Sequence, residues 1–202
     1  MNEVRADLRA YYEEEARLGL RNMLRGRRLR LRDEFLTLLR AEGRESLVDF
    51  GAGPGLDGAG FVAADLRFVG LDLAHGNALL AAENGVTVVQ GSITAPPFRP
   101  ASFDAGWSMS TLMHLPRAEV AGAVAAMALS LHPGSPLLVG VWGGELGDII
   151  GDSTITGQRR LFSHRPLEQN HDLLAAGGAI ERAETWEAGE DGWDYQIFLL
   201  RT

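Results

Sequence analysis

The types and spacing of the residues from Asp49 to Gly55 could bind a nucleotide-like ligand. An apolar run at Leu47 and Val48 ends in Asp49, and three glycines then follow at alternate positions. This pattern predicts a buried strand that turns sharply into a helix, where the missing Cβ atoms let a ligand approach the backbone. The helix, expected from about Leu56, would direct free N–H groups and its positive dipole end at that ligand. We therefore expect a nucleotide-binding turn.

Two further side chains with useful chemistry follow other predicted strands. Asp72 ends the strand expected over Arg67–Asp72, and a carboxylate at that place can accept both hydroxyl hydrogen bonds of a ribose. His114 comes just after the fourth predicted strand, at the edge where ligands bind to α/β sheets. An imidazole there is a candidate general base, and packing or hydrogen bonding is its alternative role.

Two common nucleotide-binding patterns do not fit the glycine turn. A phosphate loop of the Gly-x-x-x-x-Gly-Lys-Ser/Thr type needs a Lys, and all 19 basic residues of the chain are Arg. A dinucleotide fingerprint, Gly-x-Gly-x-x-Gly/Ala, fits Gly51 and Gly53, but its third small residue falls on Leu56. The bulk of Leu56 would block the close helix–strand contact that this fingerprint requires.

The residues above must be positioned by strands that alternate with helices, a pattern that predicts an α/β fold with a Rossmann-like, doubly wound sheet. The expected buried strands are 46–50, 67–72, 86–90, 103–108 and 137–142. The expected helices between them are 56–66, 77–83 and 117–131. The Gly-rich, polar segment 143–158 predicts a mobile stretch, and a further helix is expected at 166–176. Strands at 179–188 and 193–201, with a turn at 189–192, should form an antiparallel hairpin that completes a mostly parallel, seven-stranded sheet.

Two helices are expected ahead of the sheet. Apolar residues recur at helical spacing as far as Leu20, with three glutamates at 13–15 on the opposite face, and a second helix is expected at about 27–42. We expect residues 1–45 to form a helical lid or substrate cap, and residues 46–202 to form the ligand-binding domain. Five Arg residues lie between 25 and 32. They could form a phosphate site, but we favour the interpretation that they form a solvated helix face.

The order of these motifs resembles that of a known family. Asp-x-Gly-x-Gly-x-Gly after a buried strand, with Asp72 at the end of the next strand, resembles the class I S-adenosylmethionine-dependent methyltransferases. Within them the chain is most similar to the methyltransferase type 11 and ubiquinone-methyltransferase-like group, over residues 46–142. The resemblance implies S-adenosylmethionine as the cofactor and methyl transfer to O, N or C of a small-molecule acceptor.

The resemblance also implies a role for individual residues toward the donor. Asp49 would hold the methionine ammonium, directly or through water, while the backbone at 51–53 passes close to the methionine and ribose. Asp72 would accept the ribose hydroxyls, Leu73 would lie against the adenine, and Ser92 stands where the family often has an Asp that contacts the adenine amino group. The full set of expected donor-binding residues is Asp49, Gly51, Ala52, Gly53, Gly55, Asp72, Leu73, Ser92, Ile93 and Ser108.

Four residues are candidates for the acceptor side. His114 would take a proton from an acceptor that must lose one. Tyr11 and Tyr12 could fold from the N-terminal lid over the donor, and core packing is their alternative role. Trp142, which ends the fifth predicted strand, is expected to form a pocket wall.

The composition limits the other partners that we expect. A net charge of −8 disfavours a general affinity for nucleic acid or for an anionic membrane. No apolar run approaches the ~20 residues of a membrane span, and the start lacks a secretory signal, so the cytoplasm is the expected location. The chain has no Cys and its His residues lack partners at metal-ligand spacing, so no metal site is expected. The sequence does not specify an oligomeric state.

Three functions are compatible with these motifs. The leading hypothesis is a methyltransferase that acts on a small molecule. A catalytically silent S-adenosylmethionine-binding partner subunit is the alternative, because Ser92 replaces the family's Asp and Pro133-Gly134-Ser135 lacks the Lys and second Gly of the family's Leu-Lys-Pro-Gly-Gly turn. A nucleic-acid methyltransferase, suggested by the Arg residues between 25 and 32, conflicts with the acidic balance and with the absence of an Asn/Asp-Pro-Pro-Tyr signature.

Overall fold

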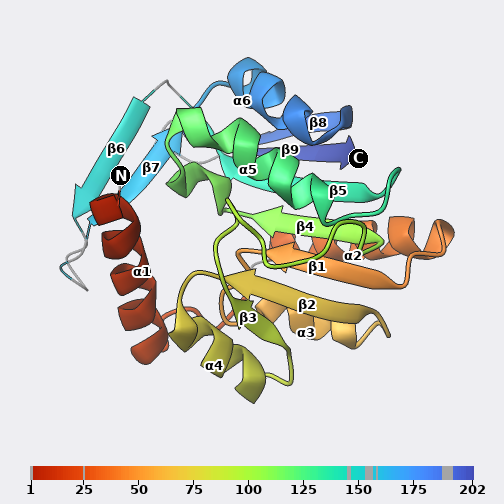
Figure 1. Ribbon diagram of the computed structural model, residues 1–202, viewed down its shortest axis with the longest axis horizontal. Coiled ribbons are helices and arrows are strands. Elements are labelled where there is room, and N and C mark those ends of the chain that lie inside the picture. Colours follow the sequence, from red (N-terminus) through yellow and green to blue (C-terminus); the bar gives the residue numbers. More distant parts are fainter. Residues whose placement is uncertain (1, 25, 145–146, 153–156, 158, 188–192) are drawn as a thin grey trace.

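A central seven-stranded sheet organises the computed structural model, which describes residues 2–24, 26–144, 147–152, 157, 159–187 and 193–202 (Figure 1). The strand order is β3-β2-β1-β4-β5-β9-β8. The strands of this sheet are β1 (Ser46–Phe50), β2 (Arg67–Asp72), β3 (Val88–Gln90), β4 (Ala105–Met109), β5 (Pro136–Trp142), β8 (Ala179–Glu187) and β9 (Asp194–Arg201). The α/β, doubly wound fold expected from the sequence is confirmed.

The sheet is parallel except at one strand. β1 pairs in parallel with β2 and β4, whereas β9 lies antiparallel between β5 and β8. The chain builds outward from β1 to β3 and then returns to place β4 on the other side of β1. The connections that follow β1 and β4 therefore run to opposite faces of the sheet at this reversal, which is where open α/β sheets bind their ligands. The turn expected at 189–192 and residue 25 of the Arg-rich stretch fall outside the described residues.

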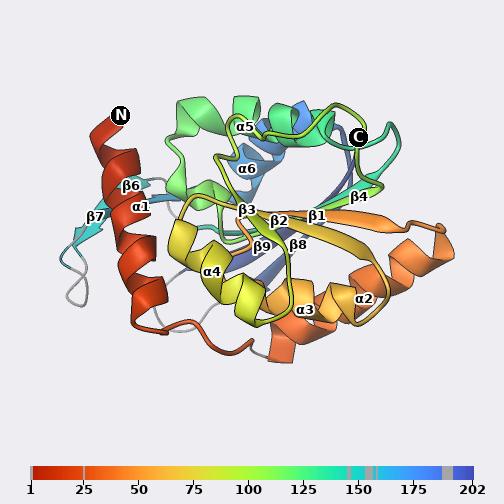
Figure 2. The same ribbon diagram turned by 60° about the horizontal axis from the view of Figure 1, so that its bottom comes forward.

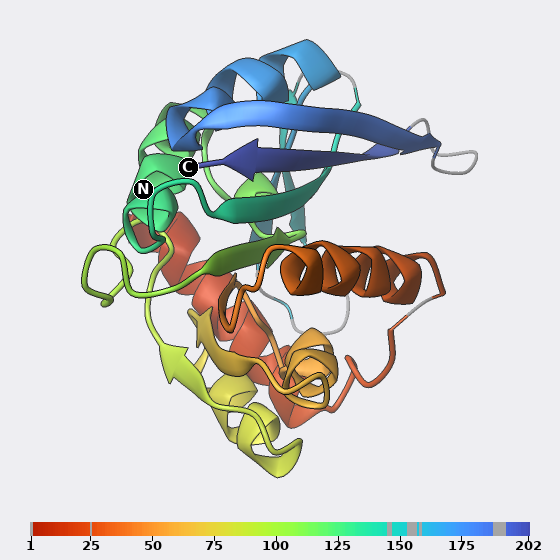
Figure 3. The same ribbon diagram turned by 90° about the vertical axis from the view of Figure 1, so that its right-hand side faces the viewer.

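Helices cover both faces of the sheet (Figures 2 and 3). α5 (Arg117–Leu129) and α6 (Leu167–Leu174) lie on one face, and α2 (Gly26–Ala41) and α3 (Leu56–Val62) lie on the other. Each layer has its own apolar core: Val48 and Phe50 pack with residues of α5, while Leu47 packs with residues of α2 and α3. The side chains of β1 alternate between these two cores, as the pleat of a strand requires. Within the described residues, no helix is long and apolar enough to cross a membrane.

The two N-terminal helices have different roles in the fold. α2 contributes Leu31, Phe35, Leu36 and Leu39 to the apolar core beneath the sheet, where Phe35 packs on Trp107. α2 is therefore part of the layer that covers the sheet, although it lies in the segment that the sequence predicted as a lid. Only α1 (Asn2–Arg17) lies beside the carboxyl edge of the strands (Figure 1).

α1 is held mainly by polar contacts. Glu13 accepts hydrogen bonds from the backbone N–H groups of His75 (2.7 Å) and Gly76 (2.6 Å), which open helix α4 (His75–Glu83). On its other side, Asp7 pairs with Arg159 at 2.9 Å. The buried residues of α1 belong to neither of the two apolar cores, in contrast to those of α2. α1 is thus a cover attached to the rim of the sheet.

A hairpin outside the main sheet completes this rim. β6 (Gly147–Asp152) pairs antiparallel with β7 (Arg159–His164), and β7 lies against α1 (Figure 1). The sequence prediction of a mobile stretch over 143–158 included no strand, whereas the structure has β6 at 147–152. Ile149 and Ile150 are paired with Phe162 and Leu161, so strand pairing with a later segment overrides the glycines in β6.

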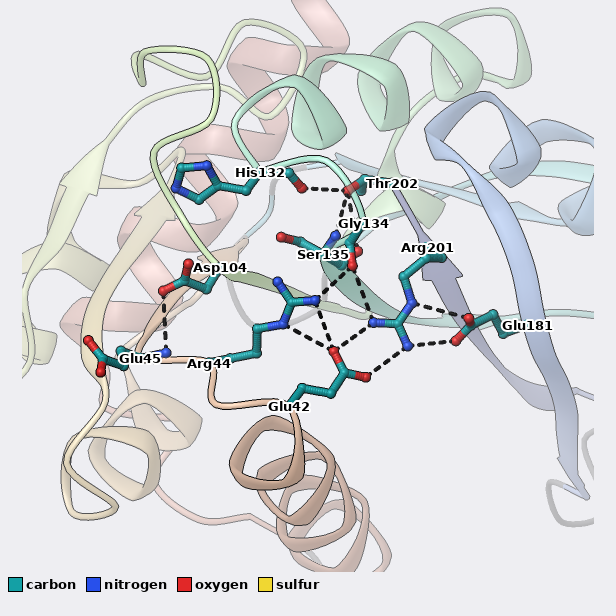
Figure 4. Close-up of polar contacts among 10 residues, drawn as sticks. All are labelled: Glu42, Arg44, Glu45, Asp104, His132, Gly134, Ser135, Glu181, Arg201 and Thr202. Atoms are coloured by element: carbon teal, nitrogen blue, oxygen red, sulfur yellow. Dashed lines mark hydrogen bonds and ion pairs between the residues drawn. The ribbon is translucent and has the colours of Figure 1, made fainter.

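A network of ion pairs lies at the amino-terminal ends of the parallel strands, here called the amino edge of the sheet (Figure 4). Arg201, near the end of β9, binds Glu42 at 2.8 Å and Glu181 at 2.8 Å, and Arg44 binds Glu42 at 3.0 Å. Arg44 also donates to the carbonyl of Gly134, just before β5. The network ties the end of α2 to three strands at the amino edge, away from the ligand-binding edge.

Candidate active site

A cavity of about 320 Å³ lies at the carboxyl edge of the parallel strands. Its floor comes from the glycine turn after β1, the ends of β2, β3 and β4, and the short helix η1 (Leu112–His114). α1, β6 and β7 supply its outer wall, and the start of α5 closes one end. The cavity therefore combines the predicted nucleotide-binding turn with elements that are far from it in the chain.

The glycine turn brings its backbone to the cavity. Gly51 has a φ of 89° and donates a hydrogen bond from its N–H to the carbonyl of Leu71 at 2.7 Å. A Cβ at this position would lie 2.0 Å from Oγ1 of Thr111, so both the conformation and the space require glycine. Gly51 lines the cavity, whereas Ala52, Gly53 and Gly55 of the same turn do not.

Asp72 is oriented by the turn and by the helix that follows it. Its Oδ2 accepts a bond from the N–H of Gly53 at 2.8 Å, and its Oδ1 accepts bonds from the N–H of Ala74 at 2.9 Å and from Nδ2 of Asn77 at 3.0 Å. Although Asp72 is only 9% exposed, it lines the cavity together with Leu73. Of the roughly four lone-pair positions of this held carboxylate, one on Oδ2 remains for a hydroxyl group of a ligand.

The other residues predicted to bind the donor divide into two groups. Ser92 and Ile93, after β3, line the cavity, and the Ser92 hydroxyl lies 2.9 Å from that of Thr94. Asp49 and Ser108 do not line it. Ser108 donates to the carbonyl of Phe50 at 2.8 Å within the sheet, and Asp49 is 2% exposed and faces the layer of α2 and α3.

The cavity brings together two of the residues predicted for the acceptor side. The hydroxyl of Tyr12 lies 2.7 Å from Nε2 of His114, and Nδ1 of His114 lies 2.8 Å from the carbonyl oxygen of Leu161. A carbonyl only accepts, so Nδ1 carries the proton and Nε2 presents its lone pair to Tyr12. Tyr12 therefore donates to His114, and its own oxygen keeps lone pairs that can accept a further hydrogen bond.

Burial keeps His114 neutral. It lowers the pKa of His114 from 6.5 to about 4; the bond to the Leu161 carbonyl opposes this shift, and the charges of Arg160 and Arg21 add to it. Burial also raises the pKa of Tyr12, so its hydroxyl stays protonated. At neutral pH the pair is an uncharged hydrogen-bonding unit.

The structure places the remaining two predicted residues elsewhere. Tyr11 turns away from the cavity, with its hydroxyl 3.4 Å from Glu15 and its ring under the guanidinium of Arg160. Trp142 is half-buried at the end of β5 and packs on Tyr195, with ring centroids 5.1 Å apart. Neither residue is among those that line the cavity, so the structure does not bring them to the residues assigned to the acceptor side.

Several cavity residues had no signal in the sequence. Arg21, just after α1, pairs with Glu15 at 3.3 Å and lies over the ring of Tyr12 at 5.5 Å. Arg5 binds Glu119 across the mouth of the cavity. The glutamates at 13–15 looked like a solvated face, but Glu13 and Glu15 make specific contacts. Ser110 has a φ of 56°, a strained conformation that is often found at functional sites.

Comparison with known proteins gives two findings. Residues 48–139 match the family model described as a methyltransferase domain. The fold is similar to that of a 1,6-didemethyltoxoflavin-N1-methyltransferase from Burkholderia thailandensis, solved with 1,6-didemethyltoxoflavin and S-adenosylhomocysteine (21% identity, 100% of this chain and 89% of that chain, TM-score 0.74). It is also similar to a SAM-dependent methyltransferase from Methanosarcina mazei (15% identity, 78% and 92%, TM-score 0.69) and to DhpI in complex with SAH (15% identity, 98% and 97%, TM-score 0.69).

Proposed function

We propose that this chain is a class I S-adenosylmethionine-dependent methyltransferase and that its acceptor is a small molecule bound in the cavity beneath α1. The observation that carries the proposal is the enclosure of the cavity. α1, β6 and β7 wall it on the outer side, and its volume of about 320 Å³ must hold the acceptor together with the donor. Such a space suits a compact acceptor better than a polymer.

The residues on the donor side fit S-adenosylmethionine. Asp72 offers the remaining lone pair of a held carboxylate to a ribose hydroxyl, and Gly51 supplies backbone where a Cβ would collide with Thr111. Leu73, Ser92 and Ile93 line the adjoining wall, where the adenine would lie. When bound, S-adenosylmethionine supplies an electrophilic methyl group on a sulfonium. The chain's own task is to hold the acceptor atom in line with that methyl group, a contribution worth about 7–11 kcal/mol at best.

We propose that His114 accepts the proton that the acceptor loses. Its Nε2 lone pair accepts the hydroxyl hydrogen of Tyr12, and the Tyr12 oxygen can accept a hydrogen bond from an acceptor O–H or N–H. The proton then passes in two linked transfers: Tyr12 takes the proton of the acceptor as it gives its own to Nε2 of His114. An imidazole with a pKa of about 4 is a weak base. It suffices nonetheless, because an oxygen or nitrogen becomes far more acidic as it receives a methyl group.

α1 is the part of the N-terminal segment that we propose as a lid. It contributes Leu8 and Tyr12 to the cavity, and its anchors are hydrogen bonds and partly exposed ion pairs, each worth about 1 kcal/mol or less. These anchors allow α1 to move aside for ligands without disturbing the two apolar cores.

No three His, Asp or Glu side chains gather as metal ligands in the described part of the chain.

Label transfer tests the proposal. The protein is incubated with methyl-labelled S-adenosylmethionine and a panel of phenols, amines, N–H heterocycles and carboxylic acids, with a transfer RNA and a DNA duplex as separate samples. We expect label on at least one small acceptor. Binding of S-adenosylhomocysteine without turnover of any sample would favour the silent partner subunit, and label on nucleic acid alone would contradict a small acceptor.

A further inference from the structure

Behind the glycine turn, on the face of the sheet that α2 and α3 cover, two buried carboxylates share one guanidinium. Asp49 lies near the end of β1, Asp57 lies in the first turn of α3, and Arg28 reaches them from the first turn of α2. Asp49 and Asp57 are 2% and 4% exposed. The mechanism proposed above uses neither Asp57 nor Arg28.

The hydrogen bonds of this cluster are concentrated on one oxygen. Oδ2 of Asp57 accepts a bond from Nε of Arg28 at 2.8 Å, a second bond from the same guanidinium, and a bond from Nε1 of Trp107 at 3.3 Å. The guanidinium also lies over the Trp107 ring, 5.3 Å from its centroid. Arg28 and Asp57 therefore form a tight ion pair that the indole helps to position.

Asp49 is left without such a partner. Its Oδ1 is buried and accepts no hydrogen bond from the described residues. Burial raises the pKa of Asp49 well above its ordinary value; the charge of Asp57 adds to this effect, Arg28 opposes it and Asp72 adds to it. Once Arg28 has neutralised Asp57, the cluster contains one more acid than cation. A buried carboxylate in this state favours the arrival of a positive group.

We propose that Arg28 is a positioning residue for the amino-acid end of S-adenosylmethionine: by neutralising Asp57, it leaves Asp49 as the carboxylate that balances the donor's ammonium group. This inference rests on the proposed function. Asp49 lies two residues before Gly51, whose backbone lines the cavity, so the unbalanced charge is next to the donor site. Without Arg28, two buried acids would face each other, and protonation of Asp49 would compete with binding of the ammonium.

Two probes separate this role from a purely structural one. S-adenosylhomocysteine carries the amino-acid end, whereas 5′-methylthioadenosine has the same adenine, ribose and sulfur but lacks that end. We expect Arg28→Met to weaken calorimetric binding of S-adenosylhomocysteine by about tenfold or more, the worth of one charge-assisted bond, and to leave methylthioadenosine binding within about twofold. Arg28→Lys should restore part of the loss. Arg30→Met, an exposed Arg on the same helix, is the matched control and should change neither affinity.

A second variant keeps the inference testable if Arg28→Met does not fold. The double variant Arg28→Met/Asp57→Asn removes the guanidinium together with the acid that it neutralises, so Asp49 should stay ionised and unpaired and binding of S-adenosylhomocysteine should be retained, whereas Asp49→Asn should lose it. Equal weakening of both probes by Arg28→Met, no weakening of either, or selective loss of S-adenosylhomocysteine in the double variant Arg28→Met/Asp57→Asn would overturn the inference alone. A wild-type protein that binds no S-adenosylhomocysteine would contradict the proposed function itself.

Discussion

At the scale of single residues, Asp72 connects the glycine turn to the helix that follows β2. Its two oxygens accept three hydrogen bonds from the protein, from Gly53, Ala74 and Asn77, and it still borders the cavity. The carboxylate is therefore held in place before any ligand arrives. A group that is already ordered loses little entropy on binding.

We expect Asp72→Asn to weaken S-adenosylhomocysteine binding by about tenfold or more, because an amide nitrogen would face one of these N–H donors and the charge would be lost. Isothermal titration calorimetry measures the effect. The matched control is Asp65→Asn, a residue outside the cavity whose φ of 67° Asn also tolerates. Equal affinities of wild type and Asp72→Asn would remove Asp72 from the donor site.

His114 makes the stability of the fold depend on pH. Its pKa is lowered from 6.5 to about 4, so between these values the unfolded chain binds a proton that the native chain does not. Stability therefore falls as the pH drops through this window. From pH 7 to pH 5 we expect the unfolding free energy of wild type to fall by about 2 kcal/mol more than that of His114→Asn.

Urea unfolding at the two pH values measures this difference. His171→Asn serves as the control, because that side chain is 51% exposed and should leave the pH dependence unchanged. If His114→Asn retained the pH dependence of the wild type, the burial of a neutral imidazole at this position would be contradicted.

At the scale of elements, the structure separates α1 from α2. α2 inserts Leu39, which is 0% exposed, into the core beneath β1 and β4, whereas α1 rests on α4 and β7. This difference predicts that changes in α2 act on global stability and that changes beneath α1 act locally.

Leu39→Ala tests the first part. Loss of a fully buried Leu side chain should lower the unfolding free energy by about 2–5 kcal/mol. Its hydrophobic transfer energy is lost, and the space that it leaves is not refilled by its neighbours. The control, Leu79→Ala on α4, affects a side chain that is 57% exposed and should change stability by about 0.5 kcal/mol or less. A small effect of Leu39→Ala on urea unfolding would place α2 outside the core.

Gly76→Ala tests the second part. A Cβ at Gly76 would lie 2.9 Å from Oε2 of Glu13 and 3.1 Å from Cβ of Ala16, so the Glu13 carboxylate must move and Ala16 must give way slightly, which loosens the contact of α1 with α4. We expect the amide hydrogens of α1 to exchange faster with solvent in this variant, as measured by mass spectrometry. Gly122→Ala in α5, where nothing lies within 4 Å of the added Cβ, should leave exchange in α1 unaltered. Unchanged exchange in Gly76→Ala would show that α1 does not depend on this contact.

At the scale of the whole molecule, the sequence predicted those features of the fold and of the site that depend on short, local patterns. The succession of strands and helices, the glycine turn and the position of Asp72 at a strand end follow from periodicity and from short motifs. The contact between Tyr12 and His114 joins residues 102 apart, and no local pattern indicates it. The β6–β7 hairpin was missed for a similar reason, since its pairing depends on Leu161 and Phe162 and its own residues include glycines.

The two edges of the sheet differ in character. The amino edge is closed by the ion pairs of Arg44 and Arg201 (Figure 4), while the carboxyl edge opens into the cavity that α1 covers. Groups from distant segments of the chain meet in that cavity. The sequence named the donor from the glycine turn and Asp72, whereas the choice of acceptor depends on segments such as α1 and β7 that carry no recognisable motif.

A small acceptor beneath α1 is tested most directly by transfer of a trideuterated methyl group from S-adenosylmethionine to a cell extract divided into low-molecular-mass and macromolecular fractions. We expect mass spectrometry to show that the wild-type protein deuterates a compound of the low-mass fraction, and that His114→Asn does so at least about a hundredfold more slowly. Deuterium found only on protein or nucleic acid, or on nothing at all, would contradict a methyltransferase whose acceptor binds in this cavity.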